Sequence, residues 1–382
     1  MNRIGNNQEV KKLNRNTVFR YMNELKQTNM ADISAALSIS GPTVLTIIND
    51  LKQSGLVREV GEYRSTGGRK AKAFATVKDA KYAIGVDITK HHVGITYTNL
   101  SRKTQSYERI RKVFCNTEEY FVELGELVRD YVKRHAIPEK RIEGMGISVP
   151  GIVDTHRNVI SRSHVLNIKD VPFEECLKHM PYPCVIVNDA NAAAIAECHD
   201  IEKKGGVVYL ALSNSVGGAV VFDAELKQSV GDHLYMGDNW RSGEFGHIII
   251  HPNGKTCYCG KKGCLDAYCS AYNLADTADG RLETFFEKLQ EGSERHKDTW
   301  KEYMSNLAIA VENIRVCFDC DIILGGYVGG FMEPYLQEFV ELLSSSDIFD
   351  SDRKYVRAGR YKKEASALGA AIYRIDRYIA EI

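Results

Sequence analysis

The stretch SGEFGHIIIHPNGKTCYCGKKGCLDAYCS, residues 242–270, carries the most specific pattern in this 382-residue chain. Cys257, Cys259 and Cys264 place three thiols within eight residues, with two glycines between them that permit a tight turn. Thiolates so close together in sequence favour a soft metal ion, and a closed tetrahedral site needs one ligand more than the cysteines provide. The stretch therefore predicts a structural metal site.

The segments on both sides of this stretch predict an α/β body. From residue 82 onward, short runs rich in β-branched residues predict the strands YAIGVDIT, HVGITYTNL and SYERIRKVF, followed by a helix over 120–132 and the strand GMGISV. A related order comes later: a hairpin of VVYLAL and GGAVVF, a strand at IIIH, a helix around 304–316, the strand DIILGG and the closing helix ALGAAIYRIDRYIA. This repetition predicts two α/β lobes.

The N-terminal segment has a different pattern, with three short helices in succession. The sequence SISGP predicts a tight turn before the third helix, with Ser40 as its N-cap and a proline in its first turn. The buried stripe of that helix is predicted to be Val44, Ile47, Ile48 and Leu51. The outward face then carries short polar side chains that suit phosphates and base edges, namely Ser40, Thr43, Thr46 and Asn49. This arrangement is typical of a helix-turn-helix.

A basic hairpin is expected after the third helix. Two predicted strands, LVREVG and AFATV, flank the glycine-rich tip EYRSTGGRK, and Arg64, Arg69 and Lys70 are expected to contact DNA as a wing. Residues 1–72 hold 12 Lys and Arg against 6 Asp and Glu, whereas the whole chain has a net charge of zero. Such a basic head on an acidic body favours a polyanionic partner. The alternatives are a helical bundle with a solvated hairpin, and a chance imbalance of surface charge.

Composition excludes several other classes of protein. Hydrophobic residues make up 44% and charged residues 26%, the ordinary globular range. No apolar run is long enough to cross a bilayer, and the N-terminus lacks the apolar segment of a signal peptide. We therefore expect a cytoplasmic protein with reduced cysteines and no membrane partner.

Several motifs in order resemble the ROK family (repressors, open reading frames and kinases). They are VPGIVD at 149–154, NDANAAA at 188–194, ExGH followed by CxCGxxGC within 244–264, LGG at 324–326 and ALGAA at 367–371. The N-terminal helices make the chain similar to the repressor members, such as xylose repressors. The resemblance implies a winged helix-turn-helix over 1–78 and an actin-like, ribonuclease H-like sugar-kinase domain over 79–382. Its two lobes are expected at 79–187 and 188–382.

The resemblance also implies ligands. The histidine of ExGH maps onto His247, which joins Cys257, Cys259 and Cys264 as the fourth ligand of a structural Zn²⁺; His251 is the competing candidate. The sugar-binding residues implied by the family are Asn188, Asp189, Glu244, His247 and Asp266. The family usually has Glu where this chain has the shorter Asp266, which either changes the sugar accepted or loses the contact. Asp189 corresponds to the catalytic base of the kinases, and it is also placed to cap the helix that follows it.

The phosphate loops of the family kinases are not retained. Their first loop is DxGGT-like, but here residues 87–91 read DITKH, and their GTG-like second loop reads SNS at 213–215. Phosphoryl transfer needs backbone N–H groups close to the phosphates, and side chains obstruct that approach. We expect a repressor of carbohydrate-utilisation genes that acts as a homodimer or dimer of dimers and is relieved by a sugar effector. The alternatives are a sugar kinase with an appended DNA-binding head, and a body that only dimerises.

Overall fold

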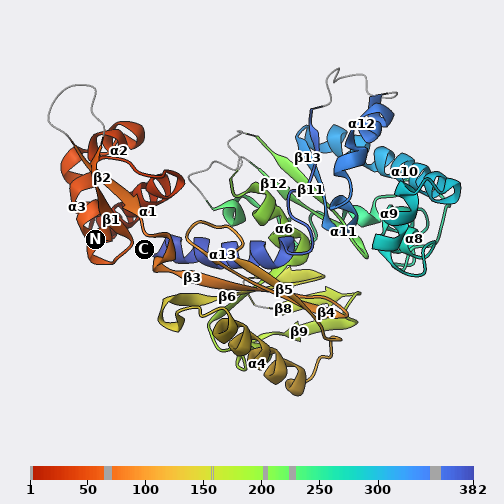
Figure 1. Cartoon of the computed structure of the whole chain (residues 1–382), viewed down its shortest axis with the longest axis horizontal. Helices are drawn as coiled ribbons and strands as arrows, with labels where there is room; N and C mark the ends of the chain where they lie inside the picture. Colours follow the sequence, from red (N-terminus) through yellow and green to blue (C-terminus); the bar gives the residue numbers. More distant parts are fainter. Residues whose placement is uncertain are drawn as a thin grey trace.

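The structure is a computed structural model that describes residues 3–63, 71–155, 157, 159–200, 205–222, 229–344 and 354–382. The N-terminal part, here called the head, comprises residues 3–63 and 71–76 (Figure 1). Its elements are α1 (Arg3–Glu24), α2 (Met30–Leu37), α3 (Gly41–Gln53), β1 (Val57–Tyr63) and β2 (Ala71–Thr76). The two strands pair antiparallel. The predicted order of three helices and a hairpin is therefore present, and the expected wing residues Arg64, Arg69 and Lys70 lie outside the described residues.

Local chemistry explains where the head helices begin and end. The Asn29 side chain caps α2 by accepting hydrogen bonds from the N–H groups of Ala31 and Asp32. Ser38 ends α2 in the left-handed conformation, and Ser40 begins α3 in an extended one. The pair α2 and α3 is bent by 118° at the turn between them, within the range of a helix-turn-helix. The predicted buried stripe of α3 is confirmed: Val44, Ile47, Ile48 and Leu51.

No single helix in the described part of the chain is long and apolar enough to cross a membrane. Only the bent pair α2 and α3 reaches the required length and composition together.

The first lobe is built on a five-stranded sheet in the order β10-β6-β3-β4-β5. The strands are β3 (Tyr82–Ile88), β4 (His92–Asn99), β5 (Ser106–Arg111), β6 (Ile142–Val149) and β10 (Cys184–Asn188). Strands β3, β4 and β5 pair antiparallel, while β6 and β10 run parallel to β3. The helix α4 (Glu118–Arg134) covers one face (Figure 1). A small antiparallel sheet extends the lobe with β7 (Ile152–Asp154), β8 (Val159–Ser163) and β9 (Ile168–Pro172), and α5 (Glu174–Leu177) follows.

The second lobe has a four-stranded sheet in the order β12-β11-β13-β14. The strands are β11 (Val207–Leu212), β12 (Val216–Val221), β13 (Asp321–Gly325) and β14 (Val356–Ala358). The surrounding helices are α6 (Asp189–Cys198), α7 (Asp266–Cys269), α8 (Tyr272–Ala275), α9 (Leu282–Gln290), α10 (Glu294–Phe318), α11 (Gly326–Gly329) and α12 (Leu336–Ser344). The prediction of two α/β lobes is confirmed. The prediction of a strand at IIIH is wrong: Ile249 forms only an isolated bridge with Cys264, because the chain turns at once into the cysteine loop.

The C-terminal helix α13 (Ala365–Glu381) packs against the first-lobe sheet and against α6, on the side opposite α4 (Figure 1). The close packing of α13 requires glycine at two positions. A Cβ on Gly369 would lie 1.6 Å from the carbonyl oxygen of Ala192, and a Cβ on Gly146 would lie 1.9 Å from the carbonyl oxygen of Ala370. The predicted second lobe over 188–382 thus ends in a helix that belongs structurally to both lobes.

The head shares one core with the body. Val18, Phe19 and Phe74 of the head pack with Leu100 of the first lobe and Ile375 of α13. The boundary expected at residues 78 and 79 lies at the short 3-10 helix Lys78–Ala80. There the Lys78 ammonium donates a hydrogen bond to the Asn23 side chain at 2.7 Å. The two parts are therefore packed against each other around this junction.

Candidate functional site

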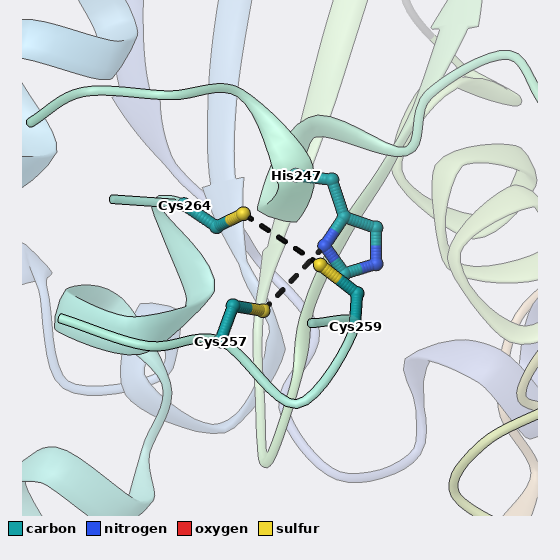
Figure 2. Close-up of side chains that lie close together, drawn as sticks. All are labelled: His247, Cys257, Cys259 and Cys264. Carbon is teal, nitrogen blue, oxygen red and sulfur yellow. Dashed lines mark hydrogen bonds between the residues drawn. The ribbon is translucent and has the colours of Figure 1, made fainter. Parts of the chain in front are cut away.

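A cluster of four metal-binding side chains lies where the sequence predicts it. His247, Cys257, Cys259 and Cys264 offer ligand atoms that all lie within 4.8 Å of one another (Figure 2). His247 Nδ1 is 3.8 Å from the Cys257 sulfur, and the sulfurs of Cys259 and Cys264 are also 3.8 Å apart. Metal–sulfur distances of about 2.3 Å in a tetrahedron place ligand atoms at such separations. The donor set and its spacing therefore fit one tetrahedral metal ion.

Backbone hydrogen bonds shape the loop that carries the cysteines. The N–H of Cys257 bonds the carbonyl of Lys261 at 2.8 Å, and the N–H of Gly260 bonds the carbonyl of Cys257 at 3.0 Å. Gly260 has a φ of 89°, a left-handed conformation that a side chain would strain. The turn folds both ends of the loop back toward His247, which lies in the 3-10 helix Phe245–His247.

His251, the competing fourth ligand, is engaged elsewhere. Its Nε2 lies 2.6 Å from the Asn306 side-chain oxygen on α10, and its ring packs against Tyr268 with centroids 4.8 Å apart. His247, and not His251, is therefore the histidine that lies with the three cysteines.

A cleft of about 1170 Å³ lies beside the metal-binding cluster and is lined by residues of both lobes. Four of the five residues predicted to bind sugar line it: Asn188, Asp189, Glu244 and His247. His247 belongs to both sites, because Nδ1 faces Cys257 while Nε2 lies 3.4 Å from the Tyr258 hydroxyl, another group lining the cleft. The cleft thus gathers carboxylate, amide and imidazole groups able to bind hydroxyls.

The polar residues on the floor of the cleft are held by the start of α6. Asn188, not Asp189, is the N-cap: its side-chain oxygen accepts from the N–H of Asn191 at 2.9 Å, while its amide donates to the carbonyl of Gly151 at 2.9 Å. Asp189 accepts from its neighbour Ala190 N–H at 2.9 Å. Its pKa is raised to about 7, chiefly by burial and then by the nearby charge of Asp87. One face of the cleft therefore carries a carboxyl group poised between its two protonation states near neutral pH.

Asp266 does not reach the cleft. Its carboxylate is buried and accepts a hydrogen bond from the N–H of Val216 at 2.7 Å, and it is not among the lining residues. Asp266 thus differs from the other four residues predicted to bind sugar, because its carboxylate bonds the backbone of β12 and does not line the cleft; its contact with sugar stays a prediction.

The hairpin after β3 and a contact between the two lobes also line the cleft. The hairpin after β3 closes with the N–H of Thr89 bonding the carbonyl of His92 at 2.9 Å, and Lys90 lines the cleft beside it. The guanidinium of Arg109 from the first lobe lies over the ring of Tyr327 from the second, 5.6 Å from its centroid. The sequence alone did not single out this pair, since its two members lie more than 200 residues apart.

The predicted DNA-facing residues lie on the exposed side of α3. Ser40, Thr46 and Asn49 are exposed and Thr43 is half-buried, its hydroxyl 2.8 Å from that of Ser40. Leu45 is also 44% exposed on this helix. The sequence did not indicate it, because only short polar side chains were expected on the outward face. These side chains are accessible in the described structure.

Comparison with known proteins defines the class of protein. The model of the ROK family matches residues 83–377, and the chain belongs to this family. It is 27% identical over 265 residues to a xylose repressor of Bacillus spizizenii, a match that covers 68% of this chain and only 66% of that protein. Its fold is similar to a ROK family transcriptional regulator homologous to the Escherichia coli Mlc protein, with a TM-score of 0.78, 18% identity and 97% coverage of both chains.

The same fold also occurs in a kinase. A ROK family glucokinase from Streptomyces griseus, in complex with glucose and AMPPNP, is similar with a TM-score of 0.61 and 23% identity, covering 76% of this chain and 98% of that one. The predicted kinase-like fold of the body is therefore confirmed. The family contains both transcriptional regulators and sugar kinases.

Proposed function

We propose that this protein is a DNA-binding repressor of carbohydrate-utilisation genes that a sugar bound in the cleft releases from its operator. One feature carries the proposal: α13 contacts both the cleft and the head. At its start, Ser366 lines the cleft and its hydroxyl donates to the carbonyl of Asp189 at 3.1 Å. Ten residues further, Asp376 pairs with Arg20 of the head. At 1.5 Å per residue, about 15 Å of rigid helix joins the two contacts.

DNA recognition is assigned to α3 of the head. Its exposed hydroxyl and amide groups suit phosphates and base edges, and Leu45 suits the methyl group of thymine. The wing residues Arg64, Arg69 and Lys70 add positive charge for the phosphate backbone. Helix-turn-helix heads usually bind paired half-sites, so the active species is a homodimer or a dimer of dimers. A similar fold in a transcriptional regulator supports this assignment.

Sugar recognition is assigned to Asn188, Asp189, Glu244 and His247, whose polar groups converge on the cleft. Zn²⁺ is the metal assigned to His247, Cys257, Cys259 and Cys264, since three thiolates and one imidazole leave no open coordination position for catalysis. The metal supplies structural stability to the loop. Because His247 is a member of both sets, the metal also fixes one wall of the sugar site.

The alternative function, phosphorylation of a sugar, is favoured by Asp189, which corresponds to the catalytic base of the family kinases by resemblance and has a raised pKa. Against it, residues 87–91 (DITKH) and 213–215 (SNS) depart from the glycine-rich phosphate loops of the family kinases, and side chains of both segments line the cleft. We therefore assign the protein no kinase activity.

A DNA titration tests the proposal. A bound sequence is first selected from a random DNA pool, and its affinity for the full chain is then measured with and without D-xylose, D-glucose and other sugars. Release of DNA by a sugar, without ADP formation when ATP is present, is the expected result. Sugar-dependent ADP formation supports the kinase alternative, and failure to select any DNA sequence contradicts the repressor.

A further inference from the structure

The loop of residues 236–243, here called the cleft loop, lies at the edge of the cleft immediately before the ExGH residues. All its residues except Gly237 line the cleft. The loop is closed on itself by a hydrogen bond from the N–H of Ser242 to the carbonyl of Met236 at 3.3 Å. Its two ends are also fixed to the second lobe: the Asn191 amide lies 3.5 Å from the Met236 sulfur, and Gly243 packs against the backbone of Gly218. The tip is therefore presented to the cleft from a fixed base.

Trp240 stands at this tip in a conformation that costs a bulky residue energy. Its φ is +59°, in the left-handed region that favours glycine or asparagine. Glycine would fit this position with no steric penalty, yet the chain carries the largest side chain there, half-buried against the cleft. Strained residues of this kind persist where function requires their side chain. An indole that lines a cleft can contact a ligand bound there.

Other residues that line the cleft indicate which ligand surface Trp240 meets. The residues assigned above to the polar edge of a sugar, Asn188, Asp189 and Glu244, line the same cleft, and each offers oxygen or amide groups for hydroxyls. A pyranose has a second kind of surface, the face of its ring where C–H groups point outward. Aromatic rings provide the apolar, flat contact that such a face needs.

We propose that Trp240 is a sugar-binding residue whose indole stacks on the C–H face of a pyranose, and that it favours pyranoses with no axial hydroxyl on either face. An axial hydroxyl on the stacked face holds the sugar ring away from the indole. That hydroxyl is also removed from water without gaining a hydrogen bond, which costs free energy. D-xylose and D-glucose in the β-pyranose form present two such faces, whereas D-galactose and D-mannose each carry one axial hydroxyl and therefore present only one. The inference rests on the proposed sugar-binding function and deepens it by naming the class of effector.

The chain allows a direct optical test, because it has only two tryptophans. The other, Trp300, is 3% exposed and stacked on Tyr303 within α10, away from the cleft lining. In a Trp300→Phe background, D-xylose or D-glucose is expected to change the emission of Trp240. A second measurement avoids this core substitution: sugar affinity of the full chain is obtained by calorimetry for the parent, Trp240→Gly and Trp240→Phe, each first verified as folded by its melting curve.

We expect Trp240→Gly to weaken binding of D-xylose or D-glucose by about tenfold or more, and Trp240→Phe to keep affinity within about threefold of the parent. The parent should bind D-galactose and D-mannose more weakly, and Trp240→Gly should reduce that preference. Equal sugar affinity in the parent and Trp240→Gly overturns this inference alone. No binding of any sugar to the parent overturns the proposed function, and this inference with it.

Discussion

The Arg20 guanidinium of the head lies 3.5 Å from the carboxylate of Asp376 on α13, and both side chains are almost completely buried. Arg20 also donates to the backbone carbonyl of Asp376 at 3.2 Å. The same carboxylate lies 3.1 Å from Arg102 of the first lobe, which in turn bonds Glu24 of the head at 3.0 Å. Head, first lobe and C-terminal helix therefore meet at one buried ionic cluster.

Removing the Asp376 charge should destabilise the whole chain. Asp376→Asn leaves Arg20 and Arg102 buried without their shared carboxylate, and breaking such a buried pair costs about 3–5 kcal/mol. The matched control is Asp279→Asn, since Asp279 forms an exposed pair with Lys288 at 3.3 Å, and exposed pairs contribute about 0–1 kcal/mol. Denaturant unfolding of the two variants measures the difference. Equal stability of both would show that the cluster does not join the head to the body.

This cluster shows what the sequence could not predict. Local periodicity predicts the main sheet strands and several of the helices of both lobes, and spacing over eight residues predicts the cysteine loop. Arg20 and Asp376 are 356 residues apart and look like ordinary surface charges in helical patterns. Their burial depends on how the head packs against α13, which only the tertiary structure specifies.

Within the site, the sequence predicted most of the polar residues that line the cleft, but not the contact that each side chain makes. Asn188, Asp189, Glu244 and His247 line the cleft as expected, but Asp266 bonds the backbone of β12. The left-handed backbone of Trp240 has no sequence signal, because that conformation is set by the closure of its loop.

The metal cluster should bind one Zn²⁺ per chain. Cys259→Ser removes one of four ligands, so zinc content should fall below half occupancy after dialysis against a weak chelator, and sugar affinity should fall with it because His247 loses its fixed orientation. Elemental analysis and calorimetry measure the two effects. Cys317→Ser is the control, since Cys317 is an exposed thiol outside the cluster. Full zinc occupancy in Cys259→Ser would refute this ligand set.

Stability should depend on pH through Asp189. Its pKa is about 7 in the folded chain, raised chiefly by burial, against an ordinary value of 3.8. Between these two pH values the folded chain holds a proton that the unfolded chain has released, so stability falls as pH rises and the full loss is present above pH 7.

Asp189→Asn removes this loss of stability at high pH, because asparagine has no proton to release. The variant should gain between about 1 and 4 kcal/mol over the parent at pH 8, because each tenfold change in proton affinity corresponds to about 1.4 kcal/mol. The gain should disappear toward pH 4. Melting curves of the sugar-free proteins across this range provide the measurement, and a gain that does not vary with pH would assign the effect to packing instead.

Two substitutions in the head should have different effects, one on the affinity for DNA and the other on the preference for particular DNA sequences. Arg69→Ala should weaken binding to the selected DNA uniformly and lower the slope of log K against log salt by about one, as expected for one lost phosphate contact. Thr43→Ala should instead change which sequences are selected, because its hydroxyl, 2.8 Å from that of Ser40, lies near the start of α3. Selection from a random pool and salt titrations distinguish the two. Unchanged DNA binding in both variants would contradict the helix-turn-helix assignment.

The sugar response should require the Asp189 side chain. Asp189→Asn keeps the shape of the side chain while removing its charge, and the hydrogen bond from Ser366 of α13 goes to the backbone carbonyl of Asp189, which the substitution leaves in place. Sugar-free DNA binding should therefore be retained, while release by sugar should require a much higher sugar concentration. DNA titrations of parent and variant over a range of D-xylose or D-glucose concentrations provide the measurement.

The size of the response has a thermodynamic requirement. A sugar releases DNA only if it binds the DNA-incompetent state more tightly, and a tenfold release requires about 1.4 kcal/mol of differential affinity between the two states. By reciprocity, DNA must weaken sugar binding by the same factor, which calorimetry with and without DNA can measure. Release of the variant at the same sugar concentration as the parent would remove Asp189 from the sensor. Tighter DNA binding in the presence of sugar would reverse the direction of the switch, with α13 then stabilising the DNA-bound arrangement of the head.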